Sequence, residues 1–301
     1  MENFDNIFTT APAEETQQPQ TASRDDFDVD AWAQKKQAER DGLFIQLDER
    51  ATEVSISTDA FVDYLNVQSR FLRMGTSNAL LVAAQCPEAT QLATFDEWHQ
   101  QNASILSGEK AIAMFEMGDT YTRSDGNEGR HTNVKKVFDI SQTSAEKPPA
   151  APAYNITDLL KAVHANSGVK VEMVDQLPDN RVALYQSENN TVFVRRGMDG
   201  DSLFIALTTE LTRASMLKDG VAPKEANAAS RTASELLCRK YGVDTSKHYN
   251  VEQLRIGYFG EGSKAIRDGL GMARKAAESV SYNMEKTLNP QQRTDRSNGA
   301  R

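Results

Sequence analysis

A short segment rich in proline and alanine divides this chain of 301 residues. The segment SAEKPPAAPA, at residues 144–153, holds three prolines and four alanines in ten positions. Proline-rich segments are stiff and extended, and domain boundaries fall in stretches of this composition. The sequence therefore predicts two domains, at residues 44–143 and 156–289, joined by a linker over residues 144–155.

The first predicted domain combines helices with a pair of strands. Apolar residues recur at helical spacing after Thr58, which we expect to cap a helix, and a second helix begins near Ser77 and stops at Pro87. A short third helix is predicted at residues 95–102. Two strands are expected at KAIAMFEM and VKKVFDI, separated by the polar turn SDGNEG. This content predicts an α+β fold.

The second predicted domain is also α+β, with a helix, a three-stranded sheet and three further helices. The first helix is expected at residues 155–168, and the strands at VKVEMV, RVALYQ and TVFVRRG. Three helices follow near residues 201–220, 223–241 and 263–288, and glycines mark where the first two end.

The chain is acidic, and its acidity is unevenly distributed. It carries 34 basic and 43 acidic side chains, a formal net charge of −9. Residues 1–43 and residues 44–145 each sum to −6, whereas residues 146–301 sum to +3. This balance argues against a protein that coats duplex DNA with a broad basic surface. Residues 1–43 and 290–301 are predicted to be disordered tails, since the N-terminal one has too few large apolar groups to offset its ordering entropy.

Cysteine content and hydropathy restrict the setting of the protein. Cys86 and Cys238 are too few for a disulfide-built secreted scaffold and fit a reducing cytosol. No run of about 18 apolar residues is present, so no membrane span is expected. The first residues, MENFDNIFTTAPAEE, have neither the basic nor the apolar region of a secretory signal. We therefore expect a cytoplasmic protein that does not engage a membrane.

Five stretches between residues 64 and 143 follow one another in an order known from a protein family. They are YLNVQSRF, SNALLVAAQCPEAT, the helix around Trp98, SGEKAIAMF and VFDISQT, and a later stretch, LLCRKYGVDTS, adds to the match. They resemble ArdC-type antirestriction proteins, which bacterial mobile genetic elements such as plasmids and conjugative transposons carry. The resemblance implies a single-stranded-DNA-binding domain in front of a zincin-like metallopeptidase domain.

The resemblance also implies a metal site, and this sequence departs from the family at each ligand. The family's helix bears H-E-x-x-H, in which two histidines bind zinc and the glutamate polarises water. The matching run here is Thr209-Glu210-Leu211-Thr212-Arg213. The family's third ligand, a glutamate, corresponds to Arg231. A hydroxyl is a poor zinc ligand and a guanidinium has no lone pair to offer, so we predict no metal, no other cofactor and no peptidase activity.

Nothing else in the sequence offers a replacement for the missing ligands. The four histidines lack metal-ligand spacing and are expected to be isolated surface or core residues: His99, His131, His164 and His248. Glu210 and Arg213 are three positions apart on one helix, and Arg231 lies on the next. One hypothesis is that a Glu–Arg cluster links these helices in place of the metal; the alternative is a solvated charged face.

Single-stranded-DNA binders combine basic groups with aromatic faces on which bases stack. The candidate DNA-contact residues are Arg70, Arg73, Asn78, Gln85, Trp98, Lys110, Lys135 and Lys136. The same domain also holds the bases Arg123 and Arg130 and the aromatic residues Phe71, Phe115, Tyr121 and Phe138. The aromatic residues could instead form the core. Because the domain is acidic, we expect its binding to be weak and sensitive to salt.

Together these patterns predict an antirestriction-type, single-stranded-DNA-binding protein with a non-catalytic metallopeptidase-like domain. One alternative is a protein-interaction module, or an acidic mimic of DNA that engages a DNA-binding partner protein. The other is an active zinc metallopeptidase with unrecognised ligands. Oligonucleotide binding across a salt series and the zinc content of the protein separate the three.

Overall fold

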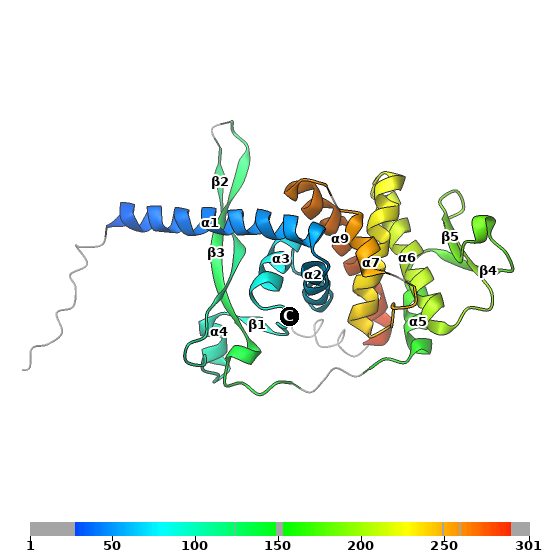
Figure 1. Cartoon of the computed structure of the whole chain (residues 1–301), viewed down its shortest axis with the longest axis horizontal. Coiled ribbons are helices and arrows are strands. Elements are labelled where there is room, and N and C mark those ends of the chain that lie inside the picture. Colours follow the sequence, from blue (N-terminus) through cyan, green and yellow to red (C-terminus); the bar gives the residue numbers. More distant parts are fainter. Residues whose placement is uncertain (1–27, 124, 149–152, 249, 259, 290–301) are drawn as a thin grey trace, which may run out of the picture. The chain divides into compact units, whose positions relative to one another are not determined.

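The chain folds into helices and two small sheets, which confirms the predicted α+β class (Figure 1). The computed structural model describes residues 28–123, 125–148, 153–248, 250–258 and 260–289. Contacts divide the chain into two units, Met1–Glu39 and Arg40–Arg301. The predicted tail at residues 290–301 and most of the predicted N-terminal tail lie outside the described residues. Within the described ranges, no helix has the length and apolar character that crossing a bilayer requires.

Helix α1, at Val29–Ile56, begins inside the predicted N-terminal tail. A carboxylate oxygen of Asp28 accepts a hydrogen bond from the Ala31 N–H at 2.9 Å, which satisfies one free donor of the first turn. The first turns are mostly exposed, and burial begins at Leu43. The structure therefore differs from the predicted tail over residues 29–43. Once buried turns have nucleated a helix, each added residue costs little, and composition alone does not reveal this.

After α1, the N-terminal part of the compact unit holds three α-helices, three strands and a short 3-10 helix. Its elements are α2 (Thr58–Arg70), α3 (Thr76–Gln85), β1 (Leu92–Ala93), α4 (Phe95–Gln100), β2 (Ile112–Thr122), β3 (Glu128–Asp139) and the 3-10 helix η2 (Ile140–Gln142). Ser57, rather than the predicted Thr58, caps α2 by accepting the Ala60 N–H at 3.3 Å. The sheet order β1-β3-β2 is antiparallel throughout, and one edge of β2 has no partner among the strands that the structure describes.

Asp139 organises the end of this sheet, in the stretch VFDISQT. Its two carboxylate oxygens accept the backbone N–H groups of Thr90 at 2.7 Å, Gln91 at 2.9 Å and Ser141 at 2.9 Å, and the Ser141 hydroxyl at 2.6 Å. Burial of Asp139 favours the neutral acid, but these hydrogen bonds outweigh it and hold the pKa of the carboxyl below its usual range. The Asp139 carboxylate therefore joins the loop before β1 to the end of β3.

The C-terminal part follows the predicted order of a helix, three strands and helices. Its elements are α5 (Ile156–Ala165), β4 (Lys170–Val174), the 3-10 helix η3 (Pro178–Asn180), β5 (Ala183–Gln186), β6 (Thr191–Arg195), α6 (Gly200–Lys218), α7 (Pro223–Tyr241), α8 (Val251–Ile256) and α9 (Ser263–Leu288). Strand β6 is central: β4 pairs with it in parallel and β5 antiparallel. Helix α8 is an element that the sequence did not predict.

One hydrophobic core runs through residues on both sides of the proline-rich segment. It extends from Leu43 on α1 to Met284 on α9. Polar contacts cross the same boundary, since an Arg239 guanidinium N–H on α7 donates to the side-chain oxygen of Asn66 on α2 at 2.6 Å. The predicted ranges 44–143 and 156–289 thus contribute to one compact unit, Arg40–Arg301.

Candidate functional site

Helices α6 and α7 lie against each other through small, buried polar side chains. The Thr208 and Ser234 hydroxyls are 2.7 Å apart, and the Thr212 hydroxyl lies 3.4 Å from the Ser230 carbonyl oxygen. Hydroxyl groups that bond across the helices satisfy one another in a dry interface. This packing places the positions that the family resemblance singled out, on α6 and α7, around a common space.

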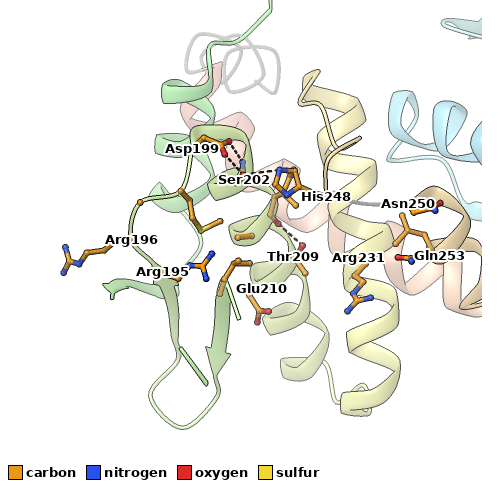
Figure 2. A pocket seen from close by; sticks show the side chains of 17 residues that line it. Arg195, Arg196, Asp199, Ser202, Thr209, Glu210, Arg231, His248, Asn250 and Gln253 are labelled. Carbon is orange, nitrogen blue, oxygen red and sulfur yellow. Dashed lines mark hydrogen bonds between the residues drawn. The ribbon is translucent and has the colours of Figure 1, made fainter. Parts of the chain in front are cut away.

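That space is a cavity of about 580 Å³ (Figure 2). It lies between the open end of the β5–β6 pair, the first turns of α6, the middle of α7 and the start of α8. Its polar lining residues are Arg195, Arg196, Asp199, Ser202, Thr209, Glu210, Arg231, His248, Asn250 and Gln253. The structure therefore brings together three of the four predicted site residues, and Arg213 lies outside the lining.

Glu210 is held by two partners, one on its own helix and one on the sheet. Its Oε2 atom accepts the Tyr185 N–H of β5 at 2.8 Å and a guanidinium N–H of Arg213 at 2.9 Å. The side chains of the ion pair are only 13% and 17% exposed. Among the described residues, no hydrogen bond or ion pair joins Glu210 to Arg231. The Glu210–Arg213 pair of our hypothesis therefore exists within α6. Glu210 also links α6 to strand β5 through the Tyr185 N–H, and the pair does not link α6 to α7.

The cavity does not offer a metal the ligands it requires. Thr209 presents a hydroxyl that donates to the Ile205 carbonyl oxygen at 2.8 Å, and Arg231 presents a cation. Glu210, the one carboxylate at the predicted positions, is engaged by Arg213. No cluster of three histidine, cysteine or acidic residues occurs in the described part of the chain. The residues present do not fit a zincin-type metal.

A serine, a histidine and an aspartate meet at the N-terminus of α6, but in an order unsuited to catalysis. Ser202 lies 2.6 Å from Asp199 and 3.1 Å from Nε2 of His248 (Figure 2). In a hydrolase triad the carboxylate holds the imidazole, and here it binds the serine hydroxyl instead. Asp199 also accepts the Ser202 N–H at 3.0 Å, so it acts as the N-cap of α6.

Neither cysteine is poised as a nucleophile. Cys238 is fully buried on α7, and burial strongly raises the pKa of its thiol. Burial also raises the pKa of the half-buried Cys86 thiol, with a further contribution from the negative charge of Asp139. Both side chains therefore remain thiols near neutral pH, and the thiolate is the reactive form.

Two of the predicted DNA-contact residues are hydrogen-bonded to the open edge of β2. The Asn78 side-chain amide donates to the Phe115 carbonyl and accepts its N–H, both at 2.8 Å. Gln85, seven positions along α3, makes the same pair of bonds with Ala113, both at 2.9 Å. An amide side chain presents a donor and an acceptor just as a neighbouring strand does. The two residues thus cover the edge of the sheet and have a structural role.

Trp98 is buried and has no face that a base could reach. Its side chain is 1% exposed, and its indole N–H donates to the Phe138 carbonyl oxygen at 2.9 Å. Trp98 belongs instead to a small second core with Ala93, Ala103 and Ile140. Because a stacking platform must be exposed, Trp98 is removed from the candidate DNA surface.

The predicted basic residues do not form one track. Arg70 donates to the carbonyl oxygens of Asn66 and Pro87, and Arg73 pairs with Glu285 at 3.6 Å. Lys110 is exposed, and the remaining two lysines lie on β3. Lys135 pairs with Glu116 at 3.2 Å, whereas Lys136 points to the opposite face of the hairpin.

The hairpin carries an exposed aromatic pair; the sequence pointed to Tyr121 among the aromatic residues of the domain, but not to its pairing with His131. The rings of Tyr121 and His131 have centroids 4.5 Å apart, and Tyr121 is 41% exposed. Gly129 faces Tyr121 in the β2–β3 register, and a Cβ atom at Gly129 would lie 2.6 Å from the tyrosine ring. The glycine thus lets the ring lie across the strand. Side chains alternate between the two faces of a sheet along each strand, so pairing the two strands in the sequence could have placed Tyr121 and His131 on the same face.

Solved structures share this fold. The crystal structure titled as the metal-free antirestriction protein ArdC from plasmid R388 matches with a TM-score of 0.50 and 15% identity, over 70% of this chain and 85% of that chain. Its Mn(II)-bound structure matches with a TM-score of 0.52 and 15% identity, over 69% and 84%. No protein-family model and no curated protein sequence matches.

The helices and sheets therefore form an α+β protein with an ArdC-type fold, as the sequence resemblance implied. ArdC of plasmid R388 is a protein with which this chain shares its fold. At 15% identity the likeness establishes the fold.

Proposed function

We propose that this chain is an antirestriction-type protein that binds single-stranded DNA through its β2–β3 hairpin. The observation that carries the proposal is the exposed Tyr121 ring, set against His131 on a protein with the ArdC-type fold. The name of the structural relative supplies the antirestriction part, and the hairpin supplies the DNA-contact part.

One face of the hairpin combines the features that single-stranded-DNA binders use. Strand alternation places Lys135 on the face that carries Tyr121, Gly129 and His131, and Arg123 follows directly after the end of β2. We call these five residues the hairpin face. A base stacked on an aromatic ring contributes about 1–3 kcal/mol whatever its identity. Arginine and lysine supply phosphate contacts that fix the strand but carry no sequence information. The hairpin face therefore favours binding without sequence preference.

The C-terminal part has a non-catalytic role in this proposal. Arg213 and Arg231 take the places of metal ligands. Without a bound metal there is no metal-bound water for Glu210 to polarise, and the Glu210 carboxylate is instead engaged by Arg213 and the Tyr185 N–H. A zincin-like frame without its metal then serves as a support that shares its core with the DNA-binding part.

Fluorescence anisotropy with a labelled single-stranded oligonucleotide tests the DNA-binding part. The wild-type affinity is expected to fall as salt rises, because phosphate contacts release counterions, and to start from a modest value because residues 44–145 sum to −6. Tyr121→Ala should weaken binding by a factor of about 5 to 150, which corresponds to the loss of about 1–3 kcal/mol of stacking.

A second exposed tyrosine provides the matched control. Tyr282 on α9 is 58% exposed and lies far along the chain from the hairpin, so Tyr282→Ala should leave the affinity unchanged. Equal losses in the two variants would reject the hairpin face. The absence of any binding at low salt would reject the DNA-binding part altogether and favour a protein-interaction module.

The antirestriction part is tested separately in cells. Expression of the protein should raise the efficiency with which unmodified plasmid DNA transforms a restricting host, and should not change transformation of a host without a restriction enzyme. Equal transformation with and without expression would contradict this part while leaving the oligonucleotide result intact.

A further inference from the structure

Two arginine side chains line the cavity at α6 without partners. Arg195 ends β6, and Arg231 lies on α7. Neither guanidinium makes a hydrogen bond or an ion pair with any residue that the structure describes. Figure 2 shows the two side chains reaching into the space around Thr209 and Glu210 from the sheet and from α7. Two guanidinium groups, each with five N–H donors, thus face one cavity without an acceptor from the described part of the protein.

The neighbouring charges do not neutralise this pair. Glu210 is bound to Arg213, and Arg196 pairs with Asp175 at 3.2 Å. Figure 2 shows Arg196 pointing away from the others. Asp199, the remaining acid of the lining, accepts two hydrogen bonds from Ser202 and caps α6. The cavity therefore keeps two positive charges that no local carboxylate serves.

We propose that this cavity binds a small organic phosphate monoester between Arg195 and Arg231. A phosphate monoester carries between −1.5 and −2 charges near neutral pH and offers three acceptor oxygens, which match two guanidinium groups in charge and in donors. A carboxylate would neutralise only one of them. Arginine is the side chain best suited to this recognition, since its planar fork binds two oxygens at once.

The rest of the lining fits an organic group attached to the phosphate. Ala183, Ile205, Ala206 and Leu254 provide apolar surface, and the side-chain amides of Asn250 and Gln253 provide donors and acceptors. The volume of about 580 Å³ lies within the usual range of small-molecule sites. Arg231 thus brings a positive charge to a position where the family resemblance implies a metal ligand, and together with Arg195 it makes the cavity suited to an anion rather than a cation. This proposal is independent of the hairpin face.

Isothermal titration calorimetry on the full chain at constant ionic strength tests the site with three probes. Inorganic phosphate reports the oxyanion alone, adenosine 5′-monophosphate reports phosphate with an organic body, and adenosine reports the body without phosphate. Both phosphates are expected to bind and adenosine is not. Tighter binding of the monophosphate than of inorganic phosphate assigns an organic ligand, and equal binding assigns free phosphate to the same two arginines.

Arginine variants give the decisive comparison. Arg231→Gln and Arg195→Gln should each weaken phosphate binding at least 10-fold, and Arg195→Lys should weaken it less, because the charge remains and the fork is lost. Arg181→Gln is the matched control, since Arg181 is an exposed arginine that pairs with Asp179 outside the cavity. Arg231 is exposed on its helix, so that variant is expected to fold. Unchanged binding in the folded Arg231→Gln protein, adenosine binding equal to that of its monophosphate, or no binding of either phosphate at millimolar concentration would overturn the proposal.

Discussion

Asn78 and Phe115 are joined by two hydrogen bonds of 2.8 Å, one from each side of the asparagine amide to the backbone of β2. A helix side chain here takes the place of a missing strand. Exposed sheet edges invite pairing with other chains, and covering them is one way in which proteins avoid this. The contact explains why an asparagine and a glutamine stand seven positions apart on α3.

Asn78→Ala should loosen this edge of the sheet. The Phe115 N–H loses its acceptor, and the free energy of unfolding should fall by about 2 kcal/mol because both bonds are lost and their partners remain partly buried. Hydrogen exchange measures the effect directly, as faster exchange at the Phe115 amide. Asn189→Ala, in the turn before β6, should leave that amide protected, and equal protection in both variants would contradict the role of Asn78.

Glu210→Ala should destabilise the protein even though Glu210 binds no metal. The change leaves the Arg213 guanidinium and the Tyr185 N–H without their shared acceptor in a mostly buried place, a loss of about 2 kcal/mol. Denaturant unfolding checks it. The comparison is Asp268→Ala, which removes an exposed ion pair with Lys264 and should cost less than about 0.5 kcal/mol. An unchanged midpoint for Glu210→Ala would show that the pair is a solvated charged face.

Asp139 should make stability depend on pH in the acidic range. The pKa of its carboxyl is lowered in the folded state, so the native protein binds fewer protons than the unfolded chain between the folded value and the ordinary value of about 3.9. The contribution is fully present above about pH 5 and is lost as the pH falls through the folded pKa. Unfolding by denaturant at several pH values below 7 measures this.

Asp139→Asn should lower stability near neutral pH and flatten this acid dependence. The matched control is Asp175→Asn, at an exposed carboxylate, which should leave the slope of stability against pH unchanged. If the free energy of unfolding of Asp139→Asn depends on pH as steeply as that of the wild type, groups other than Asp139 cause the acid sensitivity.

The purified protein is expected to carry less than stoichiometric zinc or manganese. Arg213 and Arg231 bring positive charge to two of the three expected ligand positions, and the hydroxyl of Thr209 is a weak ligand at the third. Elemental analysis by mass spectrometry after dialysis checks this. One metal ion per chain, retained at each of several protein concentrations, would show that other ligands form a site.

Local signals in the sequence predicted most of the elements. The spacing of Phe61, Tyr64 and Leu65 marked the buried side of α2, and all three are fully buried. Pro87 marked the end of α3 and Gly242 the end of α7, where the glycine has a φ of 74° that few other residues adopt. Each signal lies within a few residues of the feature it predicts.

Features that depend on distant partners could not be predicted in this way. Asn78 and Trp98 looked available for DNA because the sequence does not show that β2 and β3 supply their partners. The family resemblance singled out Thr209, Glu210 and Arg213, but Arg195 ends a strand and meets the cavity only through the tertiary fold. The resemblance therefore pointed to residues on α6 and α7 that line the cavity, but it gave no sign of the contribution of β6.

The core that crosses the proline-rich segment has a consequence for protein engineering. A break in the chain at this segment would leave each fragment with an exposed apolar surface that only the other fragment covers. Two such fragments, produced separately, should regain a folded state only when mixed. The chain could thus be developed as a split reporter whose halves signal that two fused proteins have come together.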